Sequence, residues 1–146
     1  MVFLFLTGKK MSIKIYSCND SRGLRPMWTA EEMGLSYEVE MMPFPPRFLH
    51  KEFMDVNILG TIPYLIDGDV EMTESVAMCQ YLVDKYGPTE LCVNKDEADY
   101  HYYLNWLAHS DATLTFPQTV VLRYTLQEIG VADKAADGYR RWFVAR

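Results

Sequence analysis

The sequence predicts an α/β domain built on a mixed four-stranded sheet, followed by an all-helical second domain that is incomplete. Three observations support this prediction. Segments with strand and helix periodicity alternate in the order βαβαββα between residues 12 and 88. An Asp-Gly pair at 67–68 adds an antiparallel hairpin to that alternation. From residue 97 onward every periodic segment is helical, so a second domain of another class follows.

The first strand is expected over "SIKIYS", residues 12–17, where apolar and polar side chains alternate. This period of two predicts that Ile13 and Ile15 face the core. It also predicts that Lys14 and Tyr16 face solvent. The segment "SYEVEMM" alternates in the same way and predicts a second strand. Because a helix-length segment separates the two strands, we expect them to pair in parallel through a right-handed crossover.

Two helices are expected in the first half of this domain. Apolar residues recur at helical spacing from about residue 22 to residue 33. Pro26 falls in the first turn, where a missing N–H costs little, and Gly34 stands where a helix commonly ends. After the proline-rich "PFPP", residues 47–55 predict one short amphipathic helix with an apolar face made of Phe48, Leu49, Phe53 and Met54.

A hairpin and a third helix complete the domain. The hairpin consists of "IPYLID", a turn at Asp67-Gly68 and "VEMT". The helix runs from Glu74 to Tyr86, where Gly87 ends it. These patterns place the domain boundaries as follows: an N-terminal extension over 1–11, the first domain over 12–88, a linker over 89–96 and a partial helical domain over 97–146.

The second domain begins with one long helix through "DEADYHYYLNWLAHSDATL". We expect Pro117 to kink or interrupt this helix, and "TVVLRYTLQEIG" to resume it up to a stop at Gly130. The apolar residues at 142–144 have no later residues to pack against. We therefore expect the sequence to be truncated inside a helical domain.

Composition excludes several classes of protein. A formal net charge of −6 argues against nucleic acid as a partner. The apolar run at the N-terminus is far shorter than the roughly 20 residues of a membrane span, so no membrane association is expected. The chain has three cysteines, Cys18, Cys79 and Cys92, which is an odd number for a set of disulfides. They and the histidines are not spaced as zinc ligands are. We expect no disulfide framework, no metal and a cytoplasmic protein.

Two motifs suggest a binding site. Pro63, at the start of the third strand, is a candidate cis-proline, and the residue before it, Ile62, could then pair its main chain with an extended peptide. Thr73 or Ser75 could simply cap the helix that follows. The same position can also hold an α-amino acid group. The Ser75 hydroxyl and the first-turn N–H groups would bind its carboxylate, and Glu74 would bind its ammonium group.

The stretch "YSCNDSRGLRP" offers two chemistries. Cys18 could form a redox site through its own thiol. Ser21, at the start of the first helix, could instead donate a hydrogen bond to the thiolate of a bound ligand. Cys18 lies seven residues before Arg25, near the end of the strand, which favours Ser21 and leaves Cys18 as the alternative.

On these motifs the chain resembles the glutathione S-transferase superfamily, and within it the bacterial and theta-like members that use serine. The matching segments are "YSCNDSRGLRP", "EEMGLSYE", "NILGTIPYLIDGD", "ESVAMCQYLVDKYG" and "YLNWLAHSDATL". The resemblance implies a thioredoxin-like first domain that binds glutathione. Two departures stand out: Ile58 replaces a common proline, and Val76 replaces an arginine that often follows the Glu-Ser pair.

The resemblance also implies roles for individual residues. Ser21 would stabilise the glutathione thiolate for attack on a small hydrophobic electrophile. The glutathione-binding residues would be Ile62, Pro63, Glu74 and Ser75, with His50 and Lys51 as candidates for the glycyl carboxylate. A solvated helix face explains His50 and Lys51 equally well. The electrophile pocket would take Ser110, Leu114 and Phe116, although for each of them packing in the core or in a dimer is the favoured interpretation. A homodimer of the full-length form and a role in detoxification would follow. A glutathione-dependent thiol–disulfide oxidoreductase through Cys18 and a non-catalytic interaction module are the alternatives.

Overall fold

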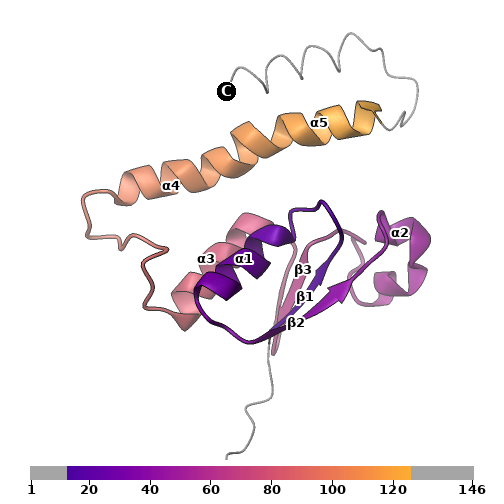
Figure 1. Ribbon diagram of the computed structural model, residues 1–146, viewed down its shortest axis with the longest axis horizontal. Coiled ribbons are helices and arrows are strands. Elements are labelled where there is room, and N and C mark those ends of the chain that lie inside the picture. The colour runs from indigo at the N-terminus through magenta and orange to yellow at the C-terminus, as the bar shows by residue number, and fades with distance from the viewer. Residues whose placement is uncertain (1–12, 126–146) are drawn as a thin grey trace, which may run out of the picture. The chain divides into compact units, whose positions relative to one another are not determined.

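The first half of the chain builds a four-stranded sheet from β1 (Ile13–Ser17), β2 (Tyr37–Met41), β3 (Tyr64–Asp67) and β4 (Val70–Met72). The strand order across the sheet is β2-β1-β3-β4. β1 pairs with β2 in parallel and with β3 antiparallel, and β3 pairs with β4 antiparallel. The crossover between the parallel strands is α1 (Leu24–Glu32), as a parallel pair requires. The predicted mixed sheet and the predicted element order are confirmed (Figure 1).

This computed structural model describes residues 13–125 of the chain. The chain divides into two units, Met1–Leu91 and Cys92–Arg146. The division falls inside the stretch 89–96 that the sequence assigns to a linker. The predicted extension over 1–11, the stop at Gly130 and the last helical segment lie outside the described residues.

The C-terminus of α1 shows how a local pattern dictates structure. Gly34 has a positive φ of 62°, a conformation that costs glycine little. Its N–H donates to the Glu31 carbonyl at 3.0 Å, and the Leu35 N–H donates to the Ala30 carbonyl at 2.9 Å. These two bonds form a Schellman motif, which satisfies carbonyl groups that the helix end would otherwise leave exposed.

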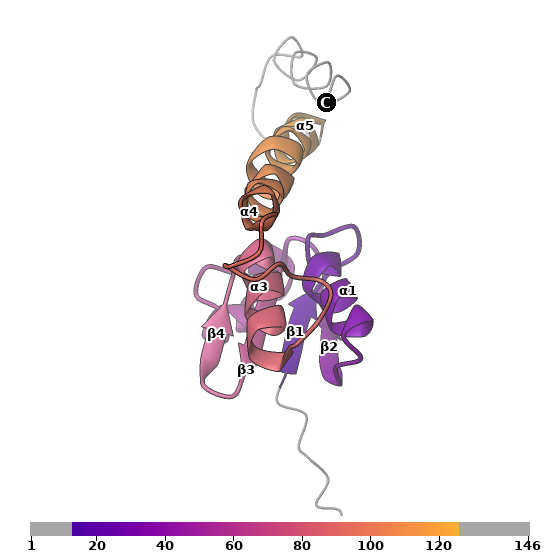
Figure 2. The same ribbon diagram turned by 90° about the vertical axis from the view of Figure 1, so that its left-hand side faces the viewer.

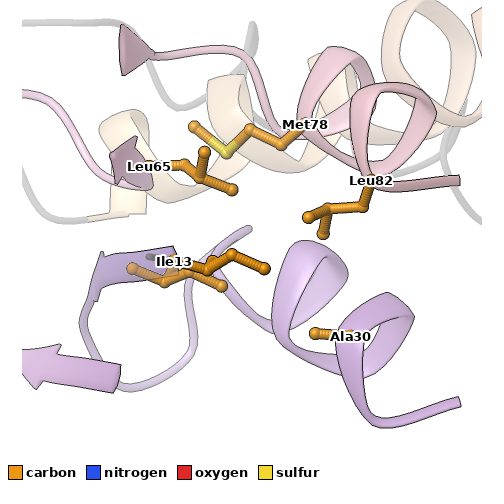
Figure 3. Packing of buried hydrophobic residues seen from close by; sticks show 6 residues of the cluster. Ile13, Ala30, Leu65, Met78 and Leu82 are labelled. Carbon is orange, nitrogen blue, oxygen red and sulfur yellow. The ribbon is translucent and has the colours of Figure 1, made fainter. Parts of the chain in front are cut away.

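Each face of the sheet carries its own hydrophobic cluster. The first lies under α1 and α3 (Ser75–Tyr86), which cover one face side by side (Figure 2). Figure 3 shows the aliphatic side chains that fill this layer: Ile13, Ile15, Ala30, Leu65, Met78 and Leu82. The second cluster is mainly aromatic and consists of Tyr16, Met42, Phe53 and Tyr64.

The prediction that Tyr16 faces solvent is wrong. Its side chain is only 7 % exposed, and its ring centroid lies 5.2 Å from that of Phe53. The reason is that α2 (Pro46–Leu49) and a 3-10 segment, η1 (Lys51–Asp55), cover the second face of the sheet. A strand covered on both faces does not obey a simple alternation of buried and exposed residues.

The single amphipathic helix predicted over 47–55 is also wrong. α2 ends at Leu49, and His50 adopts an extended conformation (φ −146°, ψ 77°) that breaks the helix before η1 begins. Of the apolar face predicted for this segment, only Phe53 is buried, whereas Phe48 and Leu49 are exposed. The hairpin turn is shifted by one residue, because Asp67 pairs with Val70 and leaves Gly68-Asp69 as the two-residue loop.

Up to residue 125, where the described part of the chain ends, the second unit contains α4 (Tyr100–Ala108), a π-helical segment η2 (His109–Thr115) and α5 (Phe116–Thr125). They follow one another without a break, so Pro117 does not end the helical run. The irregularity falls just before the proline, in η2, where the Thr115 hydroxyl donates to the Ser110 carbonyl at 2.8 Å. A wider turn at this point avoids the clash between a proline ring and the preceding turn. Within residues 13–125, no helix has both the length and the apolar character needed to cross a membrane.

Candidate functional site

The topology brings the main predicted site residues to one end of the sheet. β1 ends at Ser17 where β3 begins at Tyr64, because the two strands are antiparallel and Tyr16 pairs with Tyr64. β4 runs antiparallel to β3, so it also ends there and leads into α3 at Ser75. Three segments therefore meet at this end, and they contain Cys18, Ser21, Ile62, Pro63, Glu74 and Ser75.

The peptide bond between Ile62 and Pro63 is cis, as predicted. Pro63 is buried and Ile62 is half-buried. The register of β1 and β3, continued two residues past its last pair, places Cys18 opposite Ile62. The loop that leads to this proline is held by Asn57, which is 4 % exposed and whose Nδ2 donates to the Thr61 carbonyl at 2.9 Å. The asparagine of this motif thus shapes the loop that presents Ile62.

The loop after β1 is organised around the Ser21 hydroxyl. Its Oγ donates to the Cys18 carbonyl at 2.9 Å and accepts the Gly23 N–H at 3.2 Å. A second hydroxyl, that of the fully buried Ser17, lies 3.3 Å from it. Gly23 has no room for a side chain, because a Cβ atom there would come within 2.0 Å of the Ser17 Oγ. Ser21 is therefore held at a defined position just before α1.

The Cys18 side chain is in a different environment. It directly follows the last residue of β1, as the sequence predicted, and it is 5 % exposed. Ser21 is half-buried, so its hydroxyl is closer to the surface of the loop. Ser21 is therefore the more accessible of these two side chains.

The start of α3 differs from a plain capped helix. Glu74 is the N-cap residue, it is exposed, and its side chain makes no capping hydrogen bond. Neither Thr73 nor Ser75 occupies the N-cap position, so the interpretation that one of them caps this helix is wrong. Ser75 is the first helical residue, is 2 % exposed, and accepts a hydrogen bond from Nη1 of Arg25 at 3.1 Å. The helix N-terminus therefore keeps its positive end and its first-turn N–H groups beside a fixed hydroxyl.

From the sequence, Arg25 could belong to the site or be a solvated charge on the helix, and its contact with Ser75 could not be predicted. It lies in the first turn of α1, fifty residues before Ser75, and no local pattern links the two. Its only sequence signal is its place four residues after Ser21. The contact exists because α1 and α3 pack against each other on one face of the sheet.

The remaining candidates lie elsewhere. His50, which is half-buried, and Lys51, which is exposed, belong to the α2–η1 segment on the other face of the sheet. Ser110, Leu114 and Phe116 belong to the second unit. The Ser110 hydroxyl donates to the Leu107 carbonyl at 2.8 Å, whereas Leu114 and Phe116 are exposed. Across residues 13–125, His, Cys, Asp and Glu side chains form no group of three or more that could hold a metal ion.

Comparisons with known proteins identify the family to which the first domain is similar. The family described as "Glutathione S-transferase, N-terminal domain" matches residues 11–84, about half of the chain. Glutathione S-transferase 3 of Schizosaccharomyces pombe is 29% identical over 102 residues, which cover 70% of this chain and 42% of that protein. Glutathione S-transferase Z2 of Arabidopsis thaliana is 42% identical over 89 residues, which cover 58% of this chain and 38% of that protein. The chain thus spans less than half the length of these two relatives.

A solved structure extends the likeness beyond the first domain. It is the glutathione transferase URE2P6 from Phanerochaete chrysosporium in complex with oxidized glutathione, at 27% identity and a TM-score of 0.79. The match covers 93% of this chain and 64% of that one. A family match over half of the chain and a shared fold over most of it lead to one conclusion. The chain belongs to the glutathione S-transferase family.

Proposed function

We propose that this chain binds glutathione at the end of the sheet where β1, β3 and α3 meet, and activates its thiol for transfer to a small hydrophobic electrophile. The observation that carries the proposal is the convergence of the Ile62–Pro63 segment, the Ser21 loop and the start of α3, which has no side-chain cap. Relatives named as glutathione transferases, one of them solved with oxidized glutathione, support it.

Each part of glutathione has a chemically matched partner in this proposal. The main chain of Ile62 pairs with the cysteinyl residue in the manner of an added strand. The first-turn N–H groups of α3 and the Ser75 hydroxyl bind the γ-glutamyl carboxylate, and Glu74 binds the ammonium group. For the glycyl carboxylate, His50 and Lys51 stay candidates from the sequence alone, since they belong to the α2–η1 segment on the other face of the sheet.

Ser21 acts on the sulfur without forming a covalent bond to it. A thiol with a pKa of roughly 8.5 is mostly protonated at neutral pH. A hydroxyl that donates to the thiolate lowers this pKa by about one unit for each 1.4 kcal/mol of preference for the charged form. The Ser21 hydroxyl donates to the Cys18 carbonyl at 2.9 Å, and the Ser17 hydroxyl lies 3.4 Å from the same oxygen. The Ser21 proton can therefore turn to a sulfur while that carbonyl keeps a donor nearby.

The reaction that follows is a nucleophilic substitution or addition. The thiol proton leaves to solvent, and the thiolate forms a carbon–sulfur bond to the electrophile. In a substitution the leaving group departs with the electron pair of the broken bond. The same proposal includes a homodimer of the full-length form and a cytoplasmic role in detoxification.

The test compares Ser21→Ala with Cys18→Ser. We expect Ser21→Ala to raise the pKa of the bound glutathione thiol by about one unit, followed by thiolate absorbance, and to slow conjugation to a chloronitroaromatic about tenfold at neutral pH. Cys18→Ser should leave both quantities nearly unchanged. If conjugation survives the loss of Ser21 and disappears with Cys18, Ser21 is not the activating residue. Failure of the wild-type chain to bind glutathione would favour a non-catalytic interaction module.

A second candidate function is thiol–disulfide exchange through Cys18, which directly follows β1 at the same end of the sheet. In that reaction the Cys18 thiolate attacks one sulfur of glutathione disulfide. A mixed disulfide forms, and one glutathione thiolate leaves; a second glutathione then releases Cys18 by the same exchange. The intact mass after incubation with glutathione disulfide separates the two candidates, because only this one adds a glutathionyl group that Cys18→Ser abolishes.

A further inference from the structure

Two pairs of side chains connect α1 to α3 beside the proposed γ-glutamyl site. Arg25 and Thr29 are four residues apart and therefore lie on one face of α1; Ser75 and Cys79 have the same spacing on α3. Nη1 of Arg25 donates to the Ser75 Oγ at 3.1 Å, and Thr29 lies near enough to Cys79 to lower the pKa of its thiol. The Thr29 hydroxyl also donates to the Arg25 carbonyl at 3.0 Å. The guanidinium group of Arg25 is thus held over the first residue of α3.

The contact determines what the Ser75 hydroxyl can still do. A serine hydroxyl has two acceptor lone pairs and one proton to donate. Arg25 occupies an acceptor position, so the proton of Ser75 stays available for a negatively charged group. Because Ser75 is almost completely buried, its hydroxyl has little freedom to turn elsewhere.

The charges around the start of α3 also indicate a role for Arg25 in binding a carboxylate. Glu74 places a carboxylate at the N-cap, which would repel the carboxylate of a ligand. The residues that follow Ser75 in the first turn, from Val76 to Met78, carry no positive charge. Arg25 brings a positive charge from α1 to the start of α3, where the helix dipole alone is worth only about half an elementary charge.

We propose that Arg25 is a positioning residue for the γ-glutamyl carboxylate: it orients the Ser75 hydroxyl toward that carboxylate and supplies the positive charge that Val76 does not. This inference rests on the proposed function, since it assumes that glutathione binds at this end of the sheet. It goes beyond that function by assigning recognition of one ligand group to a residue on another helix.

The test measures the binding of two ligands to two proteins, so that the effect of the substitution can be compared between the ligands. Wild type and Arg25→Gln are titrated calorimetrically with glutathione and with γ-aminobutyryl-cysteinyl-glycine, which lacks only the γ-glutamyl carboxylate. Arg25→Gln should weaken glutathione about tenfold and the second ligand less than about twofold. Arg25→Lys, which keeps the charge, should recover part of the loss. Equal weakening of both ligands would overturn the inference, because Arg25 would then only hold the two helices together.

Arg22→Gln is the matched control, because it removes the same charge from an exposed side chain three residues earlier. We expect it to change glutathione affinity less than about twofold. A loss as large as that of Arg25→Gln would overturn the inference, since the contact with Ser75 would then not matter. If wild type binds the two ligands equally well, the proposed γ-glutamyl site itself is wrong. That result is distinguishable, because it appears before any residue is changed.

Discussion

Two buried oxygen acceptors connect α3 to the rest of the first unit, one toward each end of the helix. At the N-terminal end, the Ser75 hydroxyl accepts one hydrogen bond from Arg25. Toward the other end, the carboxylate of Asp67 in β3 accepts hydrogen bonds from three side chains of α3. Asp67 is 2 % exposed. The distances to its Oδ2 are 2.9 Å for the Tyr81 hydroxyl, 2.7 Å for Lys85 Nζ and 2.5 Å for the Tyr86 hydroxyl.

These two clusters show how a buried polar side chain that stabilises the fold differs from one that can also bind a ligand. A carboxylate has only acceptors to offer, and three donors of α3 converge on Asp67. The Asp67 cluster, made of Asp67, Tyr81, Lys85 and Tyr86, therefore serves the fold itself. A hydroxyl bound to a guanidinium still has its own proton to give, at a helix end that attracts anions. A buried polar group can thus bind a ligand when one of its donors or acceptors is not used by a contact within the fold.

The largest effect is expected from Asp67→Ala. The change removes a buried carboxylate, and the hydroxyls of Tyr81 and Tyr86 and the Lys85 ammonium group lose the acceptor that they share. The free energy of unfolding should therefore fall by about 3 kcal/mol. Urea denaturation followed by circular dichroism measures it. Glutathione affinity of the folded fraction should stay within about twofold of wild type, because this cluster lies away from the start of α3. A large loss of affinity with little loss of stability would reverse the assignment.

Ser75→Ala should show the opposite pattern. Glutathione should bind about tenfold more weakly, because the variant lacks the donor to the γ-glutamyl carboxylate. The free energy of unfolding should change by less than about 1 kcal/mol, since the guanidinium group of Arg25 is only half-buried and can turn toward water. Calorimetric titration and urea denaturation of the same sample test both statements. Unchanged affinity would show that the N-terminal cluster is structural as well.

The sequence predicted the features that short-range patterns determine. The Schellman end of α1 follows from Gly34, and the hairpin follows from the Asp-Gly pair with a shift of one residue. Tyr16 could not be oriented from its own strand, because the segment that buries it lies more than thirty residues later. The break at His50 depends on a backbone conformation that the apolar spacing of residues 47–55 does not reveal.

The same limit applies to the candidate site: its local motifs could be predicted from the sequence, but its contacts between distant elements could not. The cis bond before Pro63 and the place of Ser75 at a helix start follow from motifs. The role of Arg25 and the closed environment of Asp67 do not, because each depends on a pairing between elements distant in the chain. A predicted topology indicates which end of a sheet a residue reaches. It does not indicate which neighbouring helix supplies its hydrogen-bond partner.

Alkaline pH should affect the Asp67 cluster more than the N-terminal one. Burial raises the pKa of Tyr81, and hydrogen bonds to Asp67 and Tyr81 raise the pKa of Lys85. Both groups hold their protons more tightly in the folded chain than in the unfolded chain, where tyrosine and lysine titrate near pH 10. Their stabilisation is therefore fully present below about pH 10 and is lost as the pH rises further.

The measurement is the midpoint of urea denaturation between pH 8 and pH 11. Wild type should lose stability more steeply above pH 10 than a variant that combines Tyr81→Phe with Lys85→Met. Comparing slopes rather than absolute values removes the constant loss that the substitutions themselves cause. Arg22→Gln should keep the wild-type slope, since a guanidinium group does not titrate in this range. Parallel slopes for wild type and the Tyr81/Lys85 variant would contradict the prediction.

The smallest effect concerns Cys79, which lies one turn after Ser75 and reports on Arg25. Burial raises the pKa of the Cys79 thiol, whereas the nearby Thr29 and the charge of Arg25 act in the opposite direction. Arg25→Gln should therefore raise this pKa further and slow alkylation of Cys79 by iodoacetamide about two- to threefold at pH 8. A background of Cys18→Ser and Cys92→Ser leaves Cys79 as the reacting thiol, and Arg22→Gln controls for the loss of charge. Faster alkylation in Arg25→Gln would instead mean that removing the guanidinium group opens the packing of α1 against α3. The contact with Ser75 would then hold the helices together in the way the Asp67 cluster does, and the contrast between the two ends of α3 would disappear.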